Sequence, residues 1–212
     1  MLKLNKLYLL DCMEGMKQFP DKYFDLAIVD PPYGINFAKT HTGKGWTVRE
    51  NKEWDSSIPP AEYFKELFRI SKDQIICGGN YMVDHIPPSQ GWVFWDKGQR
   101  NFSLADGELI FTSFDRALRV FTMPRGKHKA QDDKEGGRIH PTQKPVQLYK
   151  WILHNYAKPD MKIIDTHVGS GSSIIAFLDY GCDWIGFEID EDYHKAATKR
   201  IEIHKQQLKL FC

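Results

Sequence analysis

The chain has 212 residues, of which 42% are hydrophobic and 27% charged, and its formal net charge is +1. This composition predicts one soluble globular domain and excludes a protein that is basic over its whole surface, so local patches would have to contact any nucleic acid. The four cysteines and eight histidines lack the spacing of a zinc site or a disulfide framework, and no apolar run reaches the ~18 residues that span a bilayer. We therefore expect a cytoplasmic protein without a bound metal or a membrane segment.

Short apolar runs alternate along the chain with helical patterns. Strands are expected at 6–11 and 24–30, followed by a helix at 59–72 that Pro60 begins. Further strands are expected at 73–80, 91–97, 107–114, 118–124, 161–165 and 184–190, and further helices at 145–157, 172–181 and 191–209. This alternation predicts a single α/β domain over residues 1–212, with a Rossmann-like, doubly wound, mostly parallel sheet and helices on both faces.

Two segments, 36–57 and 122–140, fit neither pattern. We expect inserted loops there. Loops this long inside a compact domain are uncommon and are usually functional or disordered.

A glycine-containing turn follows the strand that ends at Asp165. In "IIDTHVGSGSS", Gly169 and Gly171 let the backbone approach a ligand closely, although a simple strand-to-helix turn explains the same letters. Ile174 stands where the dinucleotide fingerprint needs its third glycine. Glu188 ends the next strand, where a carboxylate would accept hydrogen bonds from both ribose hydroxyls of a nucleoside. An adenosine-bearing cofactor without a pyrophosphate therefore fits better than NAD.

The strand at 24–30 ends abruptly in the stretch "FDLAIVDPPYGINF". The carboxyl end of such a strand faces the ligand crevice, so Asp30 should point an acceptor into it. The prolines hold the backbone extended and leave the Pro31 carbonyl free, which gives a pair of acceptors that matches an exocyclic NH2 group. Tyr33 supplies an aromatic face on which a base can stack. A proline-rich turn that caps a strand is the simpler alternative.

Together these motifs resemble those of the S-adenosylmethionine-dependent DNA amino-methyltransferases, in the β arrangement in which "DPPY" precedes the cofactor loop. "LLDCMEGM", "HPTQKP" and the loop from Asp165 to Gly171 resemble further motifs of that family, in the same order, and the match covers nearly the whole chain. The resemblance implies S-adenosylmethionine as cofactor, S-adenosylhomocysteine as product and DNA as partner. It also implies a prokaryotic or phage-encoded protein and a restriction–modification setting. A domain of this size leaves little protein to contact base pairs, so we expect a short recognition site or a homodimer whose second subunit extends the footprint.

The resemblance assigns roles to individual residues. The catalytic residues would be Asp30, Pro31, Pro32 and Tyr33. The "HPTQKP" stretch also has a local explanation, because Thr142 can cap and Pro145 can start the helix that follows. The functional interpretation adds that Lys144 and the amides at that helix start would meet the methionine carboxylate of the cofactor. The full set implied to bind the cofactor is Asp11, Cys12, Asp30, Thr142, Gln143, Lys144, Asp165, His167, Gly169, Ser170, Gly171, Ser172, Glu188 and Ile189.

The cofactor loop departs from the family pattern at two positions. Thr166 and His167 stand where the family has proline and phenylalanine, so an imidazole replaces the usual aromatic wall. The ordinary interpretation of His167 is a hydrogen-bonded loop residue without a role in proton transfer.

Methyl transfer to adenine N6 would depend mainly on positioning, because the amine is a poor nucleophile and the sulfonium methyl an activated electrophile. Asp30 and Pro31 would hold the amine and stabilise its developing charge, after the nucleotide has been flipped out of the duplex. The two long loops are candidate DNA-recognition segments. Their candidate contacts are Lys39, Lys44, Trp46 and Arg49 in the first, and Arg125, Lys127 and Lys129, with His128, in the second.

Three alternatives remain open. An N4-cytosine DNA methyltransferase shares the same motifs, although a serine at position 30 would have favoured it. RNA and protein amino-methyltransferases often have asparagine there. An inactive cofactor-binding or DNA-binding subunit would account for His167.

Overall fold

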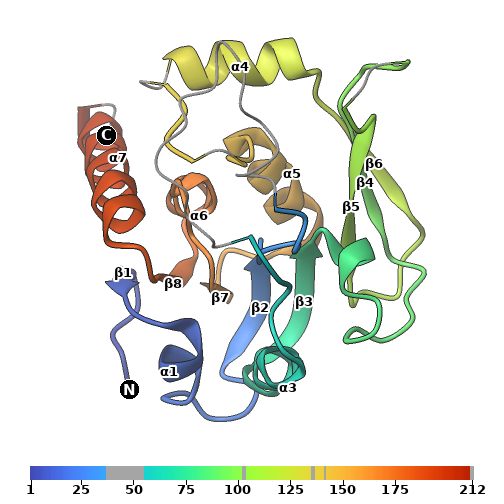
Figure 1. Ribbon diagram of the computed structural model, residues 1–212. Helices are drawn as coiled ribbons and strands as arrows, with labels where there is room; N and C mark the ends of the chain where they lie inside the picture. The colour runs from blue at the N-terminus through green and yellow to red at the C-terminus, as the bar shows by residue number, and fades with distance from the viewer. Residues whose placement is uncertain (37–54, 102–103, 135–136, 141, 211–212) are drawn as a thin grey trace.

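The computed structural model describes residues 1–36, 55–101, 104–134, 137–140 and 142–210 (Figure 1). Its central feature is an eight-stranded sheet with the strand order β1-β8-β7-β2-β3-β5-β4-β6. The strands are β1 (Lys6–Leu9), β2 (Phe24–Val29), β3 (Ser71–Cys77), β4 (Val93–Asp96), β5 (Gly107–Thr112), β6 (Arg119–Thr122), β7 (Lys162–Asp165) and β8 (Asp183–Glu188). All neighbouring pairs are parallel except the two that involve β5. The predicted mostly parallel α/β sheet is confirmed.

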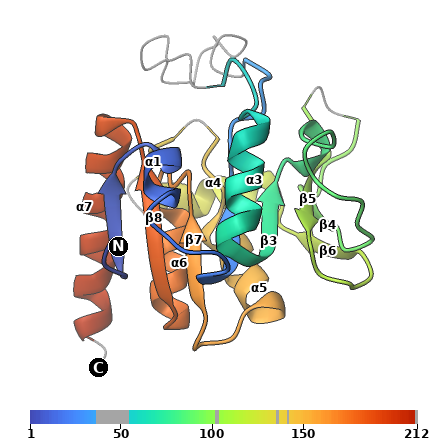
Figure 2. The same cartoon turned by 90° about the horizontal axis from the view of Figure 1, so that it is seen from below.

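Helices cover both faces of this sheet, as Figures 1 and 2 show. They are α1 (Cys12–Met16), α3 (Ala61–Ile70), α4 (Arg125–Lys134), α5 (Val146–Tyr156), α6 (Ser172–Tyr180) and α7 (Glu191–Leu210), with a short 3-10 turn, η1, at Gly79–Tyr81. Leu26 and Ile28 of β2 pack with α5 and α6, while the alternate residues Ala27 and Val29 pack with α1 and α3. Successive side chains of a strand point to opposite faces, so β2 is buried on both sides.

The apolar spacing of α3 illustrates why these elements form. Its buried residues Tyr63, Phe64, Leu67 and Ile70 recur on one helical face and pack against β2 and β3.

The segment 122–140 is not the loop that the sequence indicated, because α4 occupies most of it. A helix of lysine, glutamine and aspartate has no continuous apolar stripe, so periodicity gives no signal for it. His128 is nevertheless buried against Trp95, with ring centroids 5.8 Å apart, and this contact holds α4 on the sheet. Most of the other expected loop, 36–57, lies outside the described residues. Within the part of the chain described here, no helix is both long enough and apolar enough to cross a membrane.

Candidate active site

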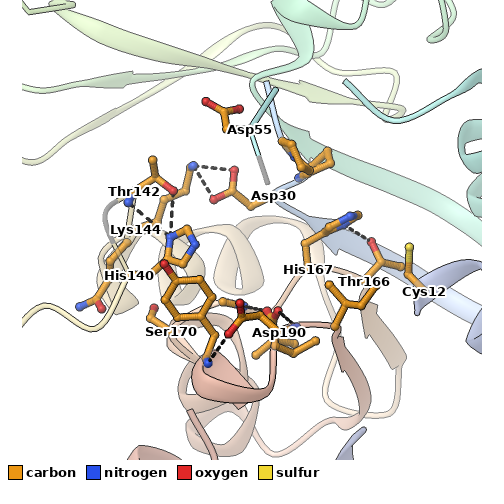
Figure 3. Close-up of a pocket in the computed structure, with 18 of the residues that line it drawn as sticks. Cys12, Asp30, Asp55, His140, Thr142, Lys144, Thr166, His167, Ser170 and Asp190 are labelled. Atoms are coloured by element: carbon orange, nitrogen blue, oxygen red, sulfur yellow. Dashed lines mark hydrogen bonds and ion pairs between the residues drawn. The ribbon is translucent and has the colours of Figure 1, made fainter. Parts of the chain in front are cut away.

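A pocket of about 320 Å³ lies where several parallel strands end (Figure 3). Asp11 follows β1, Asp30 follows β2, Thr166 follows β7 and Glu188 ends β8, and all four side chains line the pocket. The volume lies within the range of small-molecule sites, and carboxyl strand ends are where open α/β sheets bind ligands.

The pocket brings together most of the predicted site residues. Those that line it are Asp11, Cys12, Asp30, Pro31, Pro32, Tyr33, Thr142, Gln143, Lys144, His167, Gly169, Ser170, Ser172, Glu188 and Ile189. Asp165 and Gly171 are not among the lining residues. Asp165 instead accepts hydrogen bonds from the His167 amide and the Ser173 hydroxyl. Gly171 is the N-cap residue of α6 and has a left-handed conformation with φ of 81°.

The carboxylate of Asp30 is held by two partners. Lys144 Nζ lies 2.6 Å from each of its oxygens, and Tyr33 donates its hydroxyl to Oδ1 at 2.8 Å. Burial raises the pKa of Asp30, and the nearby ammonium opposes that shift. Although burial alone lowers the pKa of Lys144, Asp30 and Glu108 raise it above its ordinary value. Lys144 was expected to bind the methionine carboxylate of the cofactor, but in this structure it forms an ion pair with Asp30.

Tyr33 is fixed from several sides. Its ring is stacked on Tyr81 with centroids 5.1 Å apart, and a side chain at Gly78 would overlap it, so glycine is required there. Asp55 Oδ1 accepts hydrogen bonds from the backbone amides of Tyr33 and Gly34 at 2.8 and 3.0 Å. One aromatic face of Tyr33 is thus already stacked in this structure. No pattern in the sequence indicated Asp55.

The glycine loop is tied to the end of β8 by Glu188. Its Oε2 accepts a hydrogen bond from the Gly169 amide at 2.8 Å, and its Oε1 accepts one from the Asp190 amide at 2.9 Å. Gly169 has φ of 53°, a conformation that favours glycine. Burial raises the pKa of Glu188. Each carboxylate oxygen has a second lone pair, so Glu188 can still accept from a ligand.

The two residues that depart from the family pattern form part of a buried network. Thr166 Oγ1 lies 2.6 Å from the Tyr63 hydroxyl and 2.9 Å from His167 Nδ1. The His167 ring packs edge-on against Tyr63, with centroids 5.3 Å apart. Burial lowers the pKa of His167 to about 4, so the imidazole is neutral at pH 7. An uncharged flat ring therefore stands where the family has an aromatic wall.

The "HPTQKP" stretch has a different local structure from the expected one. Thr142 does not cap α5: Pro145 occupies the N-cap position without a side-chain hydrogen bond, and the Thr142 hydroxyl lies 3.0 Å from His140 Nδ1. The His140 ring packs against Tyr193, with centroids 4.4 Å apart. Together His140 and Tyr193 form an aromatic wall of the pocket.

The candidate DNA contacts lie away from the pocket lining or outside the described residues. Lys127 and Lys129 are exposed on α4, and Arg125 at its start donates to the Ala105 carbonyl at 3.2 Å. His128 is buried, so its expected place in an exposed phosphate-binding cluster is wrong. Lys39, Lys44, Trp46 and Arg49 lie outside the described residues.

Comparison with known proteins gives a consistent result. A family model described as "DNA methylase" matches residues 96–199. The chain is 27% identical over 209 residues to "Putative methylase YubD" of Escherichia coli K12, a match that covers 90% of this chain and 87% of the relative. It is 23% identical over 267 residues to the type II methyltransferase M1.MboII of Moraxella bovis, with 93% and 96% covered.

Solved structures match the fold over nearly the whole chain. A crystal structure of M1.HpyAVI in complex with SAM matches with a TM-score of 0.61 and 18% identity, covering 92% of this chain and 98% of that one. The PvuII cytosine-N4-specific DNA methyltransferase matches with a TM-score of 0.61 and 14% identity, covering 97% and 92%. The ordered motifs, the fold and these matches support an S-adenosylmethionine-dependent DNA amino-methyltransferase, to whose N6-adenine and N4-cytosine enzymes the chain is similar.

Proposed function

We propose that the protein transfers a methyl group from S-adenosylmethionine to the exocyclic N6 of adenine in DNA. The observation that carries this proposal is a single pocket lined by both Asp30-Pro31-Pro32-Tyr33 and the glycine loop with Glu188. The segment from Asp30 to Tyr33 has acceptors for an amine. The glycine loop and Glu188 have amides and acceptors for a nucleoside. Their common pocket allows methyl donor and acceptor to meet.

The residues of the cofactor side fit S-adenosylmethionine. Glu188 has free lone pairs for ribose hydroxyls, and the His140–Tyr193 pair gives an aromatic surface near the same loop. The absence of a third glycine agrees with a cofactor that has no pyrophosphate. S-adenosylmethionine supplies an activated methyl group on its sulfonium.

On the target side, Asp30 holds and orients the amine. Its carboxylate and the Pro31 carbonyl accept the two N–H groups, which favours a pyramidal nitrogen and stabilises the positive charge that develops there. Proton loss follows methyl transfer, so Asp30 need not act as a strong base beforehand. The base reaches this pocket only after it has been flipped out of the duplex.

DNA contacts outside the pocket are assigned to basic side chains. Lys127 and Lys129 are exposed on α4 and suit phosphate. Lys39, Lys44, Trp46 and Arg49 belong to the segment outside the described residues, and Arg125 has a backbone partner. A homodimer would extend the footprint of so small a domain.

The second candidate is methylation of cytosine N4. The structural match to the PvuII cytosine-N4-specific enzyme favours it, because the same fold supports that chemistry. Asp30 in place of a serine favours adenine. The two are separated by incubating the protein with unmethylated DNA and labelled S-adenosylmethionine, and then identifying the labelled nucleoside by chromatography. N6-methyladenine is expected, whereas N4-methylcytosine would reverse the assignment and an unlabelled digest would contradict both.

A further inference from the structure

The proposed amine-binding oxygens of Asp30 are occupied in this structure by a side chain of the protein itself. Lys144 Nζ lies 2.6 Å from both oxygens (Figure 3). It also lies 2.8 Å from the Tyr33 hydroxyl. A target amine that binds Asp30 must displace at least part of this contact. A buried ammonium that loses its anion is strongly destabilised, so a second acceptor is needed nearby.

Glu108 on β5 has the properties of that second acceptor. Its Oε2 lies 3.4 Å from Lys144 Nζ, is buried and has no hydrogen-bond partner among the described residues. Burial raises the pKa of Glu108, but Lys144 and Lys97 lower it further, to about 2, so the side chain is a carboxylate at neutral pH. The other oxygen, Oε1, is taken by a hydrogen bond from Lys97.

We propose that Glu108 is a positioning residue of the methyl-transfer reaction. Its Oε2 accepts the Lys144 ammonium when the target amine binds the oxygens of Asp30. This inference rests on the proposed function. The movement required is small, because a shift of a few tenths of an ångström brings a separation of 3.4 Å into the usual hydrogen-bond range of about 2.7–3.2 Å.

The charges support the same assignment. Asp30 and Glu108 balance Lys97 and Lys144 in the free protein. Methyl transfer adds a positive charge on the amine beside Asp30, and an ammonium left on Asp30 would repel it. Glu108 holds the ammonium away from the amine while keeping it paired.

The test measures how much the target amine contributes to DNA binding. Methylation-sensitive sequencing with the wild-type protein first gives the target position. Affinity is then measured, with S-adenosylhomocysteine present, for a duplex with the normal target base and for one whose target base has hydrogen in place of the amine. The dissociation constant for the duplex without the amine is divided by that for the normal duplex. This ratio is compared between variants, because the cost of opening each duplex is the same for every variant and cancels.

Glu108→Gln is expected to lower this ratio about tenfold, the scale of one charge-assisted hydrogen bond, because Lys144 then stays on Asp30. Lys97→Met with Glu108→Gln keeps the charges balanced and is expected to give the same loss. Adding Lys144→Met to Glu108→Gln is expected to restore the ratio, since the competitor for Asp30 is gone.

Several results would overturn the inference. An unchanged ratio in Glu108→Gln would remove Glu108 from target binding. Persistence of the loss after Lys144→Met would show that Glu108 does not act through Lys144. Loss of S-adenosylhomocysteine binding in all three variants that carry Glu108→Gln would assign Glu108 to the fold. A wild-type protein that methylates no DNA would instead contradict the proposed function.

Discussion

The Asp55 carboxylate holds the backbone of Tyr33: its Oδ1 accepts the Tyr33 amide at 2.8 Å and the Gly34 amide at 3.0 Å. Asp55 is buried and lines the pocket. It therefore fixes the turn that places the proposed catalytic residues.

Removing this acceptor should loosen the turn. Asp55→Ala leaves two backbone donors without their acceptor, and we expect a loss of about 1–3 kcal/mol in the free energy of unfolding, together with a lower kcat. Asp55→Asn is the control, because its carbonyl oxygen can still accept both amides. Urea denaturation and turnover measurements check this. An alanine variant as stable and active as the asparagine variant would refute the role of Asp55.

Glu188 should contribute to cofactor affinity. Its carboxylate is proposed to accept the ribose hydroxyls, and it also holds the Gly169 amide at 2.8 Å. Glu188→Ala is expected to weaken S-adenosylmethionine binding by about 1–3 kcal/mol, the scale for a charge-assisted hydrogen bond. Calorimetry measures the change. Unchanged affinity would remove Glu188 from the cofactor site.

Arg200 should affect the cofactor site without lining the pocket. From α7, its Nη1 donates to the Ser170 carbonyl at 3.1 Å and to Ser172 Oγ at 3.0 Å, which braces the glycine loop. Arg200→Met keeps the apolar stem but removes these donors, so S-adenosylmethionine affinity should fall by about 1 kcal/mol. Arg200→Lys should lose less. Equal affinities in all three proteins would show that the loop does not need this support.

Asp165 and His167 should give opposite pH dependences of stability. Burial raises the pKa of Asp165 from 3.8 to about 7, so its contribution is complete below pH 3.8 and is lost as the pH rises to about 7. Burial lowers the pKa of His167 from 6.5 to about 4, so its contribution is complete above pH 6.5 and is lost as the pH falls to about 4.

Between about pH 4 and 6.5 the two contributions therefore oppose one another. Asp165→Asn removes the part that falls with rising pH, and its free energy of unfolding should rise with pH more steeply than that of the wild type. His167→Gln should change the slope in the other direction. Urea denaturation across this range gives the slopes, and parallel curves for Asp165→Asn and the wild type would exclude the buried protonated carboxyl.

The parts of this site that the sequence predicted have local signals. Neighbouring residues indicate three of them: Asp30 directly after β2, the glycines at 169 and 171, and the acid that ends β8. Asp55 and Glu108 have no such signal, because their roles arise from tertiary structure. Glu108 reaches Lys144 because β5 pairs antiparallel with β3, which lies beside β2.

Lys144 shows a second limit of the sequence. Its position beside a helix start favoured an anionic ligand, and the pattern cannot distinguish a cofactor carboxylate from a carboxylate of the protein. The choice depends on how α5 packs across the sheet, which brings Lys144 to Asp30 from 114 positions away. The polar helix α4 was missed for the related reason that it has no apolar stripe to detect.

The proposed role of Asp30 is tested by the rate of methyl transfer by Asp30→Ala at saturating DNA and S-adenosylmethionine. We expect this rate to fall by ~10²–10³, because one preorganised group that stabilises the developing charge is lost. Cofactor affinity should remain close to that of the wild type, since the proposed ligand of Asp30 during the reaction is the target amine. A variant that retains near-full turnover on the same DNA would contradict the mechanism.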